Sequence, residues 1–217
     1  PPHFILKSNT MEQIWLTWAK QLQAIASTGV HFADDPYDRE RYAEVAHIAQ
    51  QMLRTLGDVP IEKIEGLVTD FAKGYATPRI DVRGAVIQND QILLVQEKAD
   101  GLWSLPGGYA DIGLSASENV TKEISEEANI QVAVKNLYSV RHKAKHAYTE
   151  DARDFYKFFF LCEQTDDAAP SPGLETRNVG FFSQDELPEL SQGRVIVDDI
   201  AAAFHAQRQP LPPALFD

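Results

Sequence analysis

The hydrophobic period of the chain changes near residue 77, and this change most constrains how the chain can fold. Before it, apolar residues recur at helical spacing. After it come short segments in which apolar residues alternate with polar ones or are continuous, as in strands. Two helical stretches lie among them. A helical segment followed by strands mixed with two helices predicts a small all-helical domain over 11–73 and an α+β or α/β sandwich domain over 79–208.

The N-terminal part predicts three helices, over 11–27, 36–56 and 60–72, with a loop starting at Thr28. Asp35 can cap the second helix, Pro36 suits its first position, and Gly57 suits its stop. The predicted apolar stripe of the first helix consists of Ile14, Trp18, Leu22 and Ile25. Such wide stripes indicate packing on the second domain or a subunit interface, and we expect a homodimer that uses this segment.

The second part predicts strands over 81–88, 91–97, 102–108, 131–142, 154–164 and 178–183. The third of these is expected to break at Pro106-Gly107-Gly108. Asn89-Asp90 between the first two is a two-residue hairpin signal. Helices are expected over 115–128 and 195–208, and a proline-rich tail follows the second of them.

The charge balance limits the possible partners. The net charge of −12 argues against a broad nucleic-acid footprint, although a small phosphate ligand held through a divalent cation stays possible. The one cysteine, Cys162, lies in an apolar run and is interpreted as a core thiol. A lone cysteine forms no internal disulfide, so we expect a cytoplasmic protein. No apolar run predicts a membrane span, and Met11 is interpreted as the natural start, with residues 1–10 left from an expression vector.

The helix over 115–128 has clear end signals. Ser115 and Glu118 form the capping-box pattern, and Asn129 tolerates the left-handed conformation that ends a helix. One side of this helix is small and apolar and is expected to pack on the sheet: Val120, Ile124 and Ala128.

Three glutamates lie on another edge of the same helix. Glu123, Glu126 and Glu127 are spaced three and four residues apart, so their carboxylates can converge. Gly107-Gly108 just before the helix can bring backbone close to a ligand. Mg²⁺ prefers carboxylate and phosphate oxygens together, so the pattern predicts a metal site that binds phosphate. The alternative is a solvated acidic face.

These residues resemble the signature of the Nudix hydrolase family. The positions that match are Gly108, Glu123, Ile124, Glu126, Glu127 and Ile130. Leu114 stands in place of the signature's first glutamate, Lys122 in place of its arginine and Asn129 in place of its late glycine. Asn129 can hold the backbone conformation of glycine, whereas Lys122 lacks the planar fork of arginine. Asp111 lies near Leu114 in the sequence and can partly replace the missing carboxylate.

The resemblance extends to a subgroup with an N-terminal helical domain that includes ADP-ribose and CDP-choline pyrophosphatases. It rests on "DGLWSLPGGYADIG", "FYKFFFLCE", "VGFFSQDELPELSQGR" and the helical stretch at 25–53. It implies a Nudix α/β/α sandwich with a mixed sheet over 79–208. It also implies a hydrolase that splits a nucleoside diphosphate linked to another group and releases a nucleoside monophosphate, with Mg²⁺ or Mn²⁺.

The resemblance also implies roles for individual residues. Glu123, Glu126 and Glu127 would hold the metals, together with the Gly108 carbonyl, and one of these glutamates or an outside carboxylate would accept the proton of water. We name Glu175 as the outside candidate, and its alternative is a solvated loop acid.

Basic residues around 135–157 are expected to meet the phosphates of the substrate, with Arg141, Lys145 and Lys157 as candidates and a solvated hairpin as the alternative. Arg83, inside an apolar strand, needs an anionic partner, which is either a phosphate or an internal salt bridge.

Two other functions stay open. Leu114 and Lys122 favour a catalytically weak domain that senses a nucleotide sugar. RNA processing is disfavoured because the chain is acidic and shows no basic stripe with interleaved aromatic residues.

Overall fold

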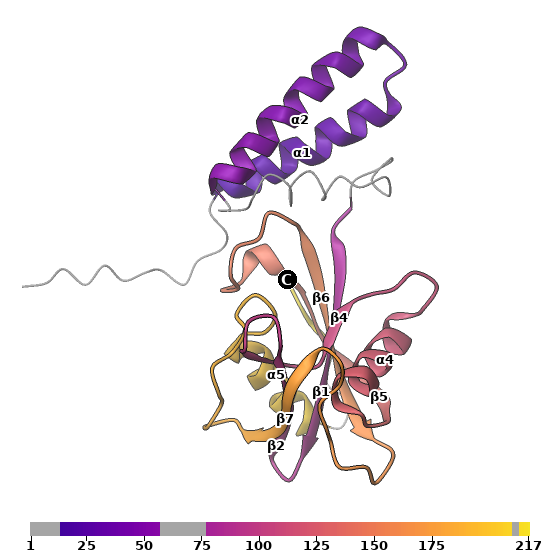
Figure 1. The fold of residues 1–217 in the computed structure, drawn as a ribbon, viewed down its shortest axis with the longest axis vertical. Coiled ribbons are helices and arrows are strands. Elements are labelled where there is room, and N and C mark those ends of the chain that lie inside the picture. The colour runs from indigo at the N-terminus through magenta and orange to yellow at the C-terminus, as the bar shows by residue number, and fades with distance from the viewer. Residues whose placement is uncertain (1–13, 57–76, 210–212) are drawn as a thin grey trace, which may run out of the picture. The chain divides into compact units, whose positions relative to one another are not determined.

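The computed structural model describes residues 14–56, 77–209 and 213–217. The chain divides into two compact units (Figure 1). One holds the described residues up to Pro78 together with Ala144–Asp154, and the other holds Arg79–Lys143 with Phe155–Asp217. The third predicted helix, over 60–72, falls outside the described residues.

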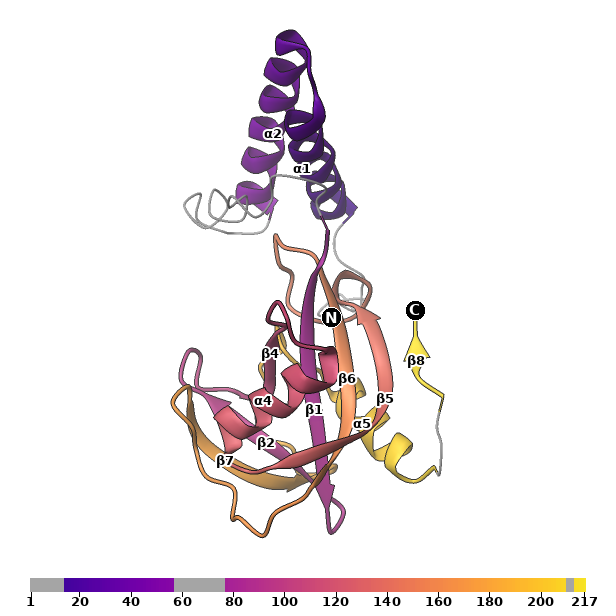
Figure 2. The same cartoon turned by 90° about the vertical axis from the view of Figure 1, so that its right-hand side faces the viewer.

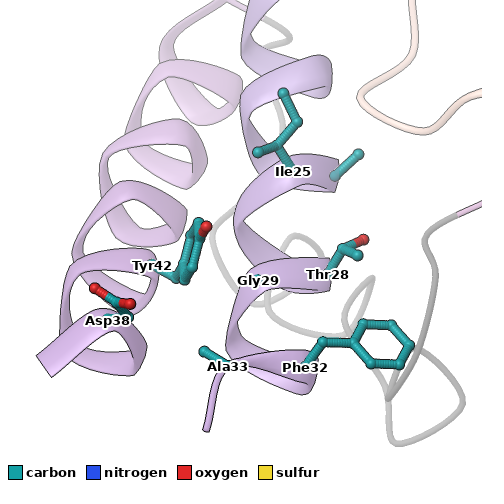
Figure 3. A pocket seen from close by; sticks show the side chains of 8 residues that line it. Ile25, Thr28, Gly29, Phe32, Ala33, Asp38 and Tyr42 are labelled. Carbon is teal, nitrogen blue, oxygen red and sulfur yellow. The ribbon is translucent and has the colours of Figure 1, made fainter. Parts of the chain in front are cut away.

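The first unit contains a pair of helices, α1 (Ile14–Phe32) and α2 (Pro36–Leu56). The predicted start of α2 is confirmed, since the Tyr37 amide donates to Asp35 Oδ1 at 2.8 Å. The loop expected from Thr28 is wrong, because α1 continues to Phe32. Gly29 does not end the helix but gives room to α2: a Cβ there would lie 2.4 Å from the Tyr42 ring, which faces Gly29 in Figure 3.

The buried side of α1 differs from the predicted stripe. Leu16, Ala19 and Ala26 are fully buried, whereas Trp18 and Ile25 are 43% and 61% exposed. The small alanines let the two helices approach closely, so contact with α2 selects this side rather than the more hydrophobic one. Ala152, from the segment 144–154, packs in the same cluster as Leu16, Ala19 and Leu53.

The second unit is built on a mixed sheet of eight strands among the described residues. The order is β3-β2-β1-β6-β5-β8, with β4 paired to β1 and β7 paired to β2. Among these strand pairs of the described residues, β1–β6 and β5–β8 are parallel and the others are antiparallel. The bounds are β1 Arg79–Gln88, β2 Gln91–Glu97, β3 Trp103–Ser104, β4 Gly107–Tyr109, β5 Val132–His142, β6 Phe155–Gln164, β7 Thr176–Ser183 and β8 Leu215–Phe216.

Two helices cover this sheet, α4 (Ala116–Ala128) and α5 (Val197–Gln207), and they lie on opposite sides of it (Figure 2). The predicted apolar side of α4 is confirmed, since its three residues are fully buried in one cluster with residues of β1, β2 and β6. Gly84 of β1 lets α4 come close, because a Cβ there would lie 2.4 Å from Ile124 Cδ1. Cys162 lies in this core, as predicted, and burial raises the pKa of its thiol to about 12. The α/β/α sandwich with a mixed sheet is confirmed.

The local turns follow the sequence signals closely. Asn89 and Asp90 both have positive φ, of 51° and 57°, in the predicted two-residue hairpin. The strand expected from Leu102 breaks at Pro106, as predicted, but Gly107 and Gly108, which were expected to belong to the break, form part of β4. β8, which pairs with β5 at Ser139 and Val140, was not predicted from the proline-rich tail. Within the described ranges, no helix combines the length and apolarity that crossing a membrane requires.

Candidate active site

The glutamate helix α4 begins and ends where its sequence predicts. Ser115 Oγ accepts from the Glu118 amide at 3.2 Å, and Glu118 Oε2 accepts from the Ser115 amide at 2.7 Å. Asn129 has φ 53° and ψ 36°, the left-handed conformation of a C-terminal stop. Both ends are therefore fixed by local interactions, and these set where the three glutamates fall along the helix.

Two of the three glutamates face the glycine turn. The buried Glu127 accepts a hydrogen bond from the Gly107 amide at 2.8 Å through Oε2. The carboxylate of Glu123 lies against Gly108, where a Cβ would come within 2.8 Å of Oε1. Gly107 has φ 144°, and a Cβ there would lie 2.0 Å from the Val82 carbonyl oxygen. Glycine is therefore required at position 107, and at position 108 it lets the Glu123 carboxylate lie directly against the backbone.

The protonation of these two carboxyl groups is shifted. Burial raises the pKa of Glu127 to about 8, although Arg83 and the Gly107 amide lower it, and nearby Glu97 and Glu123 add to the rise. Burial also raises the pKa of Glu123. Carboxyl groups crowded in a partly dehydrated site are what a bound cation would stabilise in the ionised form.

Glu126 lies differently. Its carboxylate is exposed and sits 3.3 Å from Lys122 Nζ, which also contacts Asp111 Oδ2 at 2.9 Å. The hydrogen bonds to Asp111 and Glu126 raise the pKa of Lys122. Asp111, which lies three residues before Leu114, thus pairs with Lys122, the lysine that replaces the signature arginine.

Asn119 organises the loop before the helix, a role that the sequence analysis missed. Its buried amide accepts from the Asp111 amide at 2.8 Å and donates to the carbonyls of Leu114 and Ser115 at 3.3 and 3.1 Å. The loop that contains Leu114 and Asp111 is therefore tied to the first turn of α4. A polar residue on the buried side of a helix was the available signal.

The segment before β7 closes the other end of α4. Thr176 Oγ1 donates to the Glu127 carbonyl at 2.8 Å, and the Gly173 amide donates to the same carbonyl at 3.2 Å. Glu175 lies in this segment with an exposed side chain, and its carbonyl accepts from the Lys98 amide at 3.1 Å. Its role as the outside carboxylate stays a prediction.

Glu97, at the end of β2, is the acid that sequence reasoning missed. It is buried, and its charge contributes to the raised pKa of Glu127. Ser104 Oγ donates to Glu97 Oε1 at 3.1 Å, and Arg194 Nε lies 3.3 Å from the same oxygen. A charged residue closing an apolar strand was the signal that could have identified it.

Arg83 and Lys157, both predicted to contact phosphate, are buried against one carboxylate. Arg83 meets Asp81 through two hydrogen bonds, at 2.9 and 3.0 Å, and Lys157 Nζ lies 2.9 Å from Asp81 Oδ1. The internal salt bridge named as the alternative for Arg83 is thus present. Phosphate contact by these two residues stays a prediction.

The other two predicted phosphate ligands lie in different units. Arg141 of β5 is 3.3 Å from Asp199 Oδ1 and donates to Ser139 Oγ at 3.3 Å. Lys145 ends a short 3-10 helix, η2 (Lys143–Lys145), and is exposed in the segment that groups with α1 and α2. Their roles also stay predictions.

The carboxylate groups beside the glycine turn are the type of ligand that a hard cation binds. Glu123 and Glu127 supply carboxylate oxygens, which Mg²⁺ and Mn²⁺ prefer. Among the residues that the structure describes, no three His, Cys, Asp or Glu side chains are gathered as a metal site. The third glutamate, Glu126, pairs with Lys122 and has an exposed carboxylate.

A model of the NUDIX domain matches residues 78–203, which is more than half of the chain. The chain belongs to the Nudix family. Residues 13–68 match a second model, described as the UDP-X-like, N-terminal oligomerisation domain.

Similar proteins agree with this assignment. Bacillus subtilis YjhB, provisionally assigned as an ADP-ribose pyrophosphatase, is 42% identical over 203 residues, which cover 94% of this chain and 97% of YjhB. A crystal structure of an ADP-ribose pyrophosphatase from Streptococcus suis is 39% identical with a TM-score of 0.59, covering 65% of this chain and 100% of that one. A UDP-X diphosphatase structure is 29% identical with a TM-score of 0.61, covering 94% and 98%. The chain is therefore a Nudix pyrophosphatase.

Proposed function

We propose that this enzyme hydrolyses the pyrophosphate bond of a nucleoside diphosphate linked to another group, such as ADP-ribose or CDP-choline, and releases a nucleoside monophosphate. The observation that carries the proposal is the carboxyl pair Glu123 and Glu127, held against Gly107-Gly108 in a partly buried site. Similarity to proteins described as ADP-ribose pyrophosphatases and a UDP-X diphosphatase supports the substrate class.

The proposed cofactor is Mg²⁺ or Mn²⁺, held by Glu123, Glu126, Glu127 and the Gly108 carbonyl. Such an ion, when bound, neutralises the pyrophosphate and lowers the pKa of water. The Gly107 amide orients Glu127, and the packing of Glu123 on Gly108 fixes a second carboxylate close by. Glu126 would join them after leaving Lys122, at small cost, because an exposed ion pair contributes only about 0–1 kcal/mol.

A panel of substrates tests the reaction. The purified protein is incubated with ADP-ribose, CDP-choline, nucleotide sugars and dinucleotides, with Mg²⁺ or with Mn²⁺, and the products are identified by mass. We expect a nucleoside monophosphate from at least one member and no turnover in EDTA. Turnover that persists in EDTA, or products without a cleaved pyrophosphate bond, would contradict the proposal.

The Glu127→Gln substitution tests the site. It keeps a hydrogen-bond acceptor for the Gly107 amide and removes the negative charge, so we expect turnover to fall on the order of 100-fold or more while the protein stays folded. Glu163→Gln is the matched control, since Glu163 is exposed and pairs with Lys135 on the sheet. Near-normal turnover of the Glu127 variant would refute its assignment.

A catalytically weak sensor of nucleotide sugars is the second candidate. The pairing of Lys122 with Asp111 and Glu126, together with Leu114 in place of an acid, favours it, because Lys122 already occupies the Glu126 carboxylate. Calorimetric titration with ADP-ribose beside the turnover assay separates the candidates. Tight binding without any product would favour the sensor.

We also propose a cytoplasmic homodimer that uses the helical unit. The exposed side of α1 supports the interface, since Trp18, Leu22 and Ile25 are large, apolar and 38% to 61% exposed. The groove between α1 and α2, lined by Phe32 and Tyr42 among others, extends this apolar surface (Figure 3). The likeness of 13–68 to an oligomerisation domain agrees with it.

A further inference from the structure

Arg83 uses its guanidinium to hold two separate parts of the fold together. It is 97% buried on β1, and its Nε and Nη2 donate to the two carboxylate oxygens of Asp81 on the same strand. On its other side, Nη1 donates to the Leu105 carbonyl at 3.1 Å and lies 3.5 Å from Ser104 Oγ. The planar fork thus joins β1 to the connection between β3 and β4.

This connection leads directly into the glycine turn. Leu105 is followed by Pro106, whose carbonyl accepts from the Gly84 amide at 2.9 Å, and then by Gly107. Gly107 also packs on Arg83, since a Cβ there would lie 2.9 Å from Arg83 Cα and 3.0 Å from its Cδ. The Gly107 amide, which orients Glu127, therefore follows two residues whose carbonyls both accept hydrogen bonds from β1. Leu105 accepts from the Arg83 side chain and Pro106 from the Gly84 amide.

The charges around Arg83 also favour a structural role for its guanidinium. Burial alone would raise the pKa of Asp81, but the charges and hydrogen bonds of Arg83 and Lys157 lower it to about 2. Two buried cations share this one carboxylate, and the remaining positive charge lies within electrostatic reach of Glu97 and Glu127. A phosphate would have to compete with Asp81 for donors that it already occupies in a bidentate pair.

We propose that Arg83 is a positioning residue, anchored by Asp81, that holds the Leu105–Gly108 segment so that the Gly107 amide and Gly108 backbone stay against Glu127 and Glu123. It acts through the turn and does not contact the substrate. Lys157 assists by fixing Asp81. The effect on turnover rests on the proposed pyrophosphatase activity, whereas the effect on the turn does not.

Hydrogen exchange of the Gly107 amide, measured by NMR without metal or substrate, tests the effect on the turn. Arg83→Lys keeps the charge and loses the fork, so we expect exchange at Gly107 to speed up by about tenfold or more. The matched control is Arg177→Lys, because Arg177 is exposed and donates to the Lys98 carbonyl at 3.2 Å, away from the glycine turn. Unchanged exchange in the Arg83 variant would overturn the proposal, whatever the protein hydrolyses.

Kinetics and Mn²⁺ titration by calorimetry provide the second readout. For Arg83→Lys we expect kcat and Mn²⁺ affinity to fall by about tenfold, with the KM for ADP-ribose within about threefold of wild type. A phosphate ligand would give the reverse, a raised KM with normal Mn²⁺ affinity. Asp81→Asn should reproduce the loss of kcat, since it frees the guanidinium from its anchor. A lower KM in that variant would instead indicate that Arg83 serves the phosphate.

The wild-type protein supplies a test that needs no variant to fold. The Nε–H resonance of Arg83 is followed while AMP and Mg²⁺ are added. A positioning residue, already bound to Asp81, should keep its resonance close to the starting shift, and a large shift that saturates with AMP would assign the guanidinium to the substrate.

Discussion

At the scale of single residues, the site depends on a glutamate whose ionisation is opposed by its surroundings. Glu127 is buried, has Glu97 and Glu123 nearby, and is favoured in its charged form by Arg83 and by the Gly107 amide. Without a cation the unfavourable effects dominate, and the pKa of Glu127 rises from 4.5 to about 8. The folded protein therefore binds a proton that the unfolded chain releases at a much lower pH.

This shift predicts a pH dependence of stability in EDTA. Between about pH 4.5 and 8 the folded state binds more protons, so the free energy of unfolding falls as the pH rises. Each pH unit in this window is worth at most about 1.4 kcal/mol, and we expect a loss of up to roughly 2 kcal/mol between pH 6 and 8. Urea unfolding at several pH values measures it.

Glu127→Gln is the control for this pH dependence, because an amide does not titrate. Its stability curve should be flatter than that of wild type between pH 6 and 8. Lys157, whose pKa burial lowers to about 8, begins to titrate in the upper part of this window and affects stability with the opposite sign, in wild type and variant alike. Identical slopes in wild type and variant would show that the carboxyl group of Glu127 does not carry the shift.

At the scale of elements, α4 is fixed by both its ends. Asn129, the cap residue that follows Ala128, adopts the left-handed conformation. Its Nδ2 donates to the carbonyls of Ser171 and Pro172 at 3.1 and 3.0 Å. The same residue therefore ends the helix and attaches the segment that supports the Glu127 carbonyl.

Two substitutions separate these contributions. Asn129→Ala loses the side-chain hydrogen bonds and places a Cβ in the left-handed conformation, so we expect about 1–3 kcal/mol of destabilisation. Asn129→Gly loses the same hydrogen bonds without the steric cost, so we expect less than about 1 kcal/mol. Urea unfolding measures both, and a glycine variant less stable than the alanine variant would contradict this account.

At the scale of the whole molecule, the exposed side of α1 predicts a dimer. Light scattering should give twice the chain mass of 24.3 kDa at micromolar concentration. Ile25→Glu places a charge on the apolar side and should shift the equilibrium towards monomer without unfolding the helices, since Ile25 is 61% exposed. Glu40→Gln, on the exposed part of α2, is the control. A wild-type monomer at this concentration would refute the dimer.

Several features of this protein were readable in the sequence because they depend on neighbours along the chain. The caps at Ser115 and Asn129, the start of α2 at Pro36 and the hairpin turn at Asn89-Asp90 are set within a few residues. The family signature is equally local, and with it came the sandwich fold and the helix that carries the three glutamates.

Tertiary contacts decided the rest. Trp18 and Ile25 make the more hydrophobic side of α1, yet α2 packs on the alanines, because packing depends on shape as well as on apolarity. The sequence showed that Arg83 needs an anion, and Asp81 lies two residues away on the same strand, but only the pairing of β1 with β6 brings Lys157 to this carboxylate. Glu97 joins the site for the same reason. The pair of Glu126 with Lys122, in contrast, is local, since the two residues are four apart on α4. A charge finds its partner through space, and residues far apart in the chain supply that partner only once the strands have paired.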